Sequence, residues 1–148
     1  MTNMIRARLL VLTTCLSLLL LSCHHRQDKK FNCQGFQDTL LHKFVYKTAD
    51  VLPQPVGGVE AISKAIDRNF KFPSGDVDFS GKVQVAFVVE PDGTIDGKRT
   101  IYDPSGKDSL FSKQLLNILN NTKWKPALCN GTKVPCLYIF PLNITLQD

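Results

Sequence analysis

The chain has 148 residues and a formal net charge of +5, which suits one folded domain with a short leader. From residue 48 onward eleven basic side chains are balanced by eleven acidic ones, so the positive excess belongs to the N-terminal part. The neutral remainder lacks the basic surface that nucleic acids require, and we expect no nucleic-acid partner.

All three histidines precede residue 43. Because the rest of the chain has no imidazole for catalysis or metal binding, we expect no enzyme, no metal site and no cofactor.

Residues 1–22 have the pattern of a secretory signal peptide. Arg6 and Arg8 precede an apolar run at residues 9–21, which is short for a membrane span, since a spanning helix needs about 20 residues. The run ends at Ser22-Cys23, which resembles the lipobox of bacterial lipoproteins, so we expect cleavage there and a lipid on Cys23. An ordinary signal peptide or a short uncleaved anchor is the alternative. Residues 23–44 are polar and mixed, and we expect them to form a tether.

Residues 45–102 predict one helix and two strands. Apolar side chains at helical spacing follow a turn at Gly57-Gly58, at Val59, Ile62, Ile66 and Phe70. Residues 80–90 alternate apolar and polar side chains, as in a strand with one buried face. A turn at residues 91–94 leads into a partner strand at residues 95–102, where Gly97 indicates a bulge.

Residues 103–148 predict a second helix at 109–121 and a last strand at 134–146. Trp124 lies between them and is expected to plug the core, because a tryptophan buries a large area. Pro141 lacks the N–H that a central strand needs, so the last strand should lie at a sheet edge or carry a bulge. The order α-β-β-α-β predicts an α+β fold, a two-layer sandwich with a three-stranded antiparallel sheet and two helices on one face.

The exported part contains three cysteines beyond Cys23. Cys129 and Cys136 bracket a turn-rich segment, and we expect a disulfide between them, with Cys33 unpaired or available to another chain. A tight two-residue turn at Asn130-Gly131 would instead place Cys129 opposite Thr132.

Several segments, in their order along the chain, resemble the C-terminal domain of TonB-type energy transducers. The resemblance covers about residues 45–147, and its strongest parts are Pro53-Gln54-Pro55-Val56-Gly57-Gly58, the strand that begins at Gly81 with its Asp92-Gly93 turn, Trp124-Lys125-Pro126 and Phe140-Pro141-Leu142. It implies a periplasmic domain to whose open sheet edge an extended segment of an outer-membrane TonB-dependent transporter adds as a strand. On this resemblance the partner-binding residues lie on the last strand: Tyr138, Phe140, Leu142, Asn143 and Ile144.

The chain departs from such transducers at its N-terminal side. They carry a transmembrane helix that meets a proton-driven motor, and a long proline-rich span, and we expect neither here. We therefore expect a lipid-anchored periplasmic module, on the inner or outer membrane, that binds an extended segment without harvesting the proton gradient. The alternative is a structural or assembly lipoprotein that uses the same fold to bind another envelope protein face to face. Pairing of two copies as a homodimer stays open.

Overall fold

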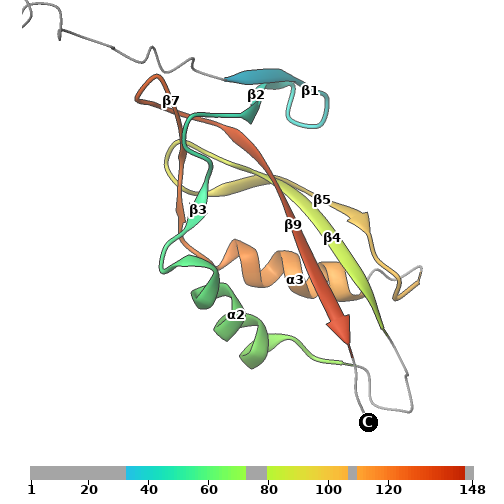
Figure 1. Ribbon diagram of the computed structural model, residues 1–148. Coiled ribbons are helices and arrows are strands. Elements are labelled where there is room, and N and C mark those ends of the chain that lie inside the picture. Colours follow the sequence, from blue (N-terminus) through green and yellow to red (C-terminus); the bar gives the residue numbers. More distant parts are fainter. Residues whose placement is uncertain (1–32, 73–79, 107–109, 146–148) are drawn as a thin grey trace, which may run out of the picture. The chain divides into compact units, whose positions relative to one another are not determined.

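The computed structural model describes residues 33–72, 80–106 and 110–145 (Figure 1). The strands are β1 (Gln34–Asp38), β2 (Lys43–Thr48), β3 (Gln54–Pro55), β4 (Ser80–Val89), β5 (Ile95–Tyr102), β6 (Trp124–Lys125), β7 (Ala127–Cys129), β8 (Thr132–Val134) and β9 (Cys136–Thr145), and the helices are α2 (Gly58–Asn69) and α3 (Leu110–Asn120). The predicted α+β class is therefore confirmed.

The main sheet is larger than predicted. It has five strands in the order β1-β2-β9-β4-β5, and it is mixed, because β2 pairs with β9 in parallel while the other pairs are antiparallel. The three predicted strands are present as β9-β4-β5, but the prediction of a three-stranded antiparallel sheet is wrong. The two additional strands come from residues 34–48, most of which were assigned to the tether. The sequence does not predict these two strands, because Val45 is their only fully buried apolar side chain and one residue makes no alternating pattern.

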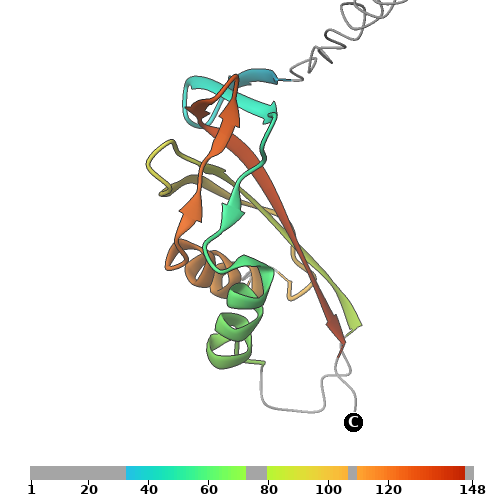
Figure 2. The ribbon, with the colours of Figure 1, turned by 60° about the vertical axis from the view of Figure 1, so that its left-hand side comes forward.

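The two helices pack against one face of the sheet, as predicted (Figure 2). Side chains of β4 that alternate along the strand meet buried residues of both helices, among them Ile62 of α2 and Leu115 of α3. On the same strand these inward positions are Val83, Val85, Phe87 and Val89, and each has no exposed surface. The predicted period-two pattern of this strand is confirmed. Val59, predicted on the inward side of the first helix, is 70% exposed.

The opposite face of the sheet is covered in part by the tip of the β1–β2 hairpin. Arg99 is the cross-strand partner of Ala86, so its side chain lies on the face away from the helices. It forms an ion pair of 2.9 Å with Asp38 at the end of β1. Lys43 reaches Glu90 at 2.6 Å. This cover agrees with the complete burial of Ala86 and Val88, which a two-layer sandwich would expose.

The predicted bulge at Gly97 is confirmed, and the hairpin tip explains the glycine. The β4–β5 register shifts between Ala86 and Val88 opposite this residue. Gly97 has φ +57, and a Cβ there would come within 2.9 Å of Leu41 Cδ1. A side chain would therefore push the hairpin off the sheet.

The disulfide predicted between Cys129 and Cys136 is wrong. Cys129 is bonded to Cys33, with 6.0 Å between their Cα atoms, and Cys136 is a free, buried thiol. The reason is the alternative noted above: Asn130 and Gly131 both have positive φ and form a two-residue hairpin turn, which sets Cys129 opposite Thr132. Cys136 lies beyond this hairpin, where it begins β9 and pairs with Val89.

Candidate strand-binding edge

Strand β9 has one paired side and one side that is mostly open. Its ladder with β4 runs over its whole length, from Cys136 opposite Val89 to Thr145 opposite Ser80. On the other side, the register with β2 contains a single pair, Tyr46 with Cys136. Within the described residues, the side of β9 that faces β2 is therefore open from Ile139 to Thr145.

The edge is open because the chain turns away after β2. Asp50 accepts a hydrogen bond of 2.8 Å from the N–H of Asn130, and Val51 forms a bridge with Leu128. The next strand, β3, pairs with β6 and not with β9. These contacts hold residues 50–55 along the β6–β7 segment, so β2 has no continuation beside β9 (Figure 1).

The direction of the backbone groups on this edge follows from two observations. The N–H of Tyr46 donates to the C=O of Pro135 over 2.9 Å, so Pro135 faces β2. Because backbone groups of alternate residues in a strand point to the same side, Ile139, Pro141, Asn143 and Thr145 also point there. Independently, Pro141 stays in register with Gln84 although it has no N–H to give, which fits a position that does not bond to β4.

The open edge therefore offers the C=O groups of four residues and the N–H groups of three. Pro141 contributes only an acceptor. Such a row of unpaired groups is the template on which an extended segment adds as a further strand.

The side chains predicted to bind the partner do not all face it. Tyr138, Phe140 and Leu142 are half-buried and pack against the helix-covered core, and Ile144 is 4% exposed. Among the five, Asn143 alone has an exposed side chain. The predicted residues thus lie along β9, but the side chains of four of them pack in the core, and any strand added here would be held chiefly through backbone groups.

A groove of about 350 Å³ lies beside the C-terminal half of this edge. Its walls are mostly apolar, with one carboxylate, and come from the end of α2 and from β9: Ile66, Asp67, Phe70, Phe72, Leu142, Asn143, Ile144 and Thr145. Phe72 is 44% exposed and packs on Phe70 with 5.2 Å between ring centroids. No local pattern in the sequence predicts this groove, because α2 and β9 are distant in the chain.

The other free edges of the sheet are less regular. The ladder of β5 shifts register twice, and its Gly97 bulge and flanking Lys98 interrupt the row of backbone groups. The β1–β2 ladder also shifts between Gln34 and Gly35. Bulges and charges of this kind discourage strand addition, so the β9 edge is the best candidate.

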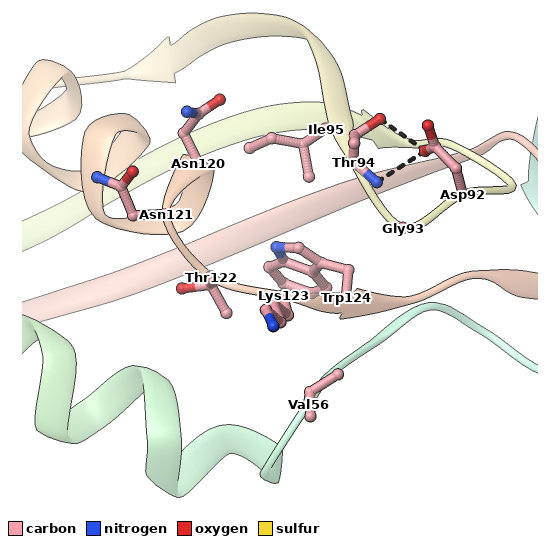
Figure 3. Close-up of a pocket in the computed structure, with 10 residues that line it drawn as sticks. All are labelled: Val56, Asp92, Gly93, Thr94, Ile95, Asn120, Asn121, Thr122, Lys123 and Trp124. Atoms are coloured by element: carbon pink, nitrogen blue, oxygen red, sulfur yellow. Dashed lines mark hydrogen bonds between the residues drawn. The ribbon is translucent and has the colours of Figure 1, made fainter.

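A second hollow, of about 530 Å³, lies between the β4–β5 turn and the segment after α3 (Figure 3). Its single carboxylate, Asp92, accepts hydrogen bonds from the N–H and hydroxyl of Thr94, at 2.9 and 2.7 Å, and these bonds hold the pKa of Asp92 below its usual value. Trp124 is 4% exposed, and its indole N–H donates to the C=O of Leu119, as expected of a core plug. Other polar side chains of this hollow also have partners outside it: Asn120 accepts a hydrogen bond from Lys98, while Asn121 and Thr122 donate to carbonyl groups of α3.

The described residues bring one set of possible metal ligands together, Cys33, Asp50 and Cys129. Both sulfurs belong to the disulfide, so they are not available as thiolates. Cys136 is buried, and burial raises the pKa of its thiol to about 11. This thiol is accordingly protonated and unreactive at neutral pH.

Residues 77–146 match the family model described as Gram-negative bacterial TonB protein C-terminal. This segment of the chain is a domain of the TonB C-terminal family. The match includes β4, β5, α3 and β9, and it begins after α2, so the β1–β2 hairpin lies outside it. A comparison with curated proteins found no match.

Membership of the family makes the domain an envelope protein-interaction module. The two described helices have 12 and 11 residues, and no helix in the described ranges is long and apolar enough to cross a membrane. The predicted signal peptide and the lipid acceptor Cys23 lie outside the described residues.

Proposed function

We propose that this protein is a lipid-anchored periplasmic module, without enzymatic activity, that binds an extended segment of an outer-membrane transporter. The segment adds as a strand to the open edge of β9 between Ile139 and Thr145. The observation that carries the proposal is this edge, where N–H and C=O groups have no partner among the described residues and lie beside a mostly apolar groove. Attachment through Cys23 would keep the domain at the membrane without coupling it to a proton-driven motor.

Backbone pairing explains how such a module can bind without a deep pocket. Each hydrogen bond gained contributes about 0.5–1.5 kcal/mol, so a short strand gains enough for a weak, reversible complex. The groove adjoining Asn143 can take one apolar side chain of the segment, and Asp67 at its wall favours a neighbouring basic group. The affinity would therefore come from the backbone and the selectivity from the groove.

A second candidate, a structural or assembly lipoprotein that binds face to face, is favoured by apolar exposure on the far face. Ile139 pairs with Ala86 and is 50% exposed, while Tyr102 pairs with Gln84 and is 54% exposed. Both strands present these residues on the side away from the helices. A flat partner could cover them without adding a strand.

Site-specific photo-crosslinking in cells separates the two candidates. A photoreactive amino acid replaces Asn143 beside the open edge, Tyr102 on the far face, or Lys123 beside the second hollow as a matched control. We expect the Asn143 position to yield a peptide from an extended segment of a transporter, identified by mass spectrometry. Crosslinks to a folded envelope protein from Tyr102, with none from Asn143, would replace the first candidate by the second.

A further inference from the structure

Pro141 lies on the open edge of β9, in the middle of its row of unpaired groups. Its side chain is exposed, and its ladder partner Gln84 stays in register on the β4 side. The proline therefore supports no part of the core and interrupts no bond of the native sheet. Its one effect on hydrogen bonding is to remove a donor from the side where another strand would arrive.

We propose that Pro141 makes this edge selective for a foreign strand over the same edge of a second copy of the domain. The inference deepens the proposed function and rests on the same edge. The competing partner is always present, because each copy carries the same row of groups and a regular edge pairs readily with itself.

The selectivity follows from counting the donors that each complex lacks. When a foreign segment without proline adds to β9, one of its C=O groups faces Pro141 and finds no donor. When two β9 edges pair, each copy brings its own Pro141, so two C=O groups lack donors in every register that includes the prolines. If the two prolines oppose each other, both bonds of that pair are missing. The proline thus removes two hydrogen bonds from a pair of identical edges, and one from the complex with a foreign strand.

Neighbouring residues show that the edge would otherwise suit self-pairing. Ile139 and Thr145 are exposed, and the side chains on the helix side, such as Leu142, are already packed in the core. Among the four residues that face the open side, none is charged. Without a charge to repel a second copy, the missing donor of Pro141 is the feature of this row that opposes dimerisation.

The test is the oligomeric state of Pro141→Thr, measured by sedimentation over a range of protein concentrations. Threonine favours strands and supplies the missing N–H. Each restored hydrogen bond corresponds to about fivefold in affinity, so self-association should tighten by about 25-fold and foreign pairing by about fivefold. Thermal unfolding checks that the variant remains folded.

The double variant Pro141→Thr, Asn143→Pro is the matched control, because it moves the missing donor by two residues and leaves their number unchanged. We expect it to return to the weak self-association of the natural chain. If Pro141→Thr stays as monomeric as the natural protein, the inference is overturned. It is also overturned if the double variant dimerises as strongly as the single one, since the side chain and not the donor would then be responsible.

These outcomes are distinct from those of the crosslinking experiment. If Pro141→Thr dimerises through β9 while the Asn143 crosslinker captures no extended segment, the proposed function fails and the role of Pro141 stands. If the crosslinker captures a transporter segment while Pro141→Thr remains monomeric, the function stands and the role of Pro141 falls.

Discussion

The β1–β2 hairpin and the open edge of β9 are neighbours on the same sheet, but they satisfy their polar groups in different ways. The hairpin is fixed by the Cys33–Cys129 disulfide, by the ion pair of buried Asp38 with Arg99, and by the ion pair of Lys43 with Glu90. The edge presents backbone groups that no strand of the described chain meets. The hairpin therefore contributes to stability, whereas the edge keeps backbone groups for the proposed partner, and each should be alterable without the other.

Removing the disulfide should have the largest effect on stability. The double variant Cys33→Ser, Cys129→Ser opens a link between residues 96 apart in sequence, and we expect the free energy of unfolding to fall by about 3 kcal/mol. Urea denaturation measures the change, with the natural protein under reducing conditions as the control. Because the edge lies elsewhere, crosslinking at Asn143 should persist in buffer without denaturant. A loss of crosslinking in folded protein would show that the hairpin shapes the edge.

Breaking the partly buried ion pair of Asp38 and Arg99 should destabilise the domain somewhat less. Arg99→Leu leaves the carboxylate of Asp38, which is 2% exposed, without its cation, and we expect a loss of about 2 kcal/mol. The loss falls below that of a fully enclosed pair because the Arg99 side chain is 28% exposed. Lys98→Leu on the same strand is the control for a general loss of charge. Equal destabilisation by the two variants would contradict a specific role for the pair.

The same pair predicts a pH dependence. Burial opposes ionisation of Asp38, but Arg99 and the N–H groups of Leu41 and Leu40 outweigh it, so the pKa lies below its usual value of 3.8. A carboxyl whose pKa is lower in the folded state stabilises the protein above its unfolded pKa, and this contribution is lost as the pH falls through the folded pKa. Stability should therefore drop below about pH 4.

Asp38→Asn isolates the contribution of this carboxyl to the pH dependence. The slope of unfolding free energy against pH should be shallower in the variant below about pH 4 than in the natural protein. Asp103, whose pKa is also lowered, accounts for part of the remaining slope: burial opposes its ionisation, and its bonds to Ser105 and Ser112 outweigh this. An unchanged slope in Asp38→Asn would mean that the hairpin carboxyl does not titrate with folding.

How far the sequence predicts this molecule depends on the range of the interactions. The alternation of β4, the turn before Thr94 and the burial of Trp124 are local or composition-driven, and all three were predicted correctly. The hairpin was missed because Asp38 is buried by Arg99, 61 residues away, a pairing that no local pattern reveals. The disulfide was misassigned for the same reason, since proximity along the chain favoured Cys136 over Cys33.

The open edge of β9 was predicted in part. Pro141 predicted a strand at the sheet edge or with a bulge, whereas β9 is the third of five strands and its ladder with β4 has no bulge. The part of the prediction that holds is that Pro141 lies where β9 has no partner on the β2 side within the described residues. The sequence could not show that β2 covers the first residue of β9 and leaves the rest open, since this depends on where the chain turns at Asp50. Nor could it show that Phe140 and Ile144 face the core.

The smallest effect on stability should come from Asn143→Pro, and it separates the two sides of β9 most directly. The N–H of Asn143 faces the open edge, so its removal should change the free energy of unfolding by less than about 0.5 kcal/mol while weakening strand addition by about fivefold or more. Leu142→Pro is the matched control, because the N–H of Leu142 faces β4 and its loss breaks the native ladder at Val83, at a cost of about 3 kcal/mol. Asn143→Ala keeps the N–H and should bind normally, which separates the contribution of the backbone from that of the side chain.

If Asn143→Pro destabilised the domain as much as Leu142→Pro, the alternation derived from Tyr46 and Pro135 would be reversed. The proline at 141 would then be a defect in the core ladder, and not a feature of the binding edge.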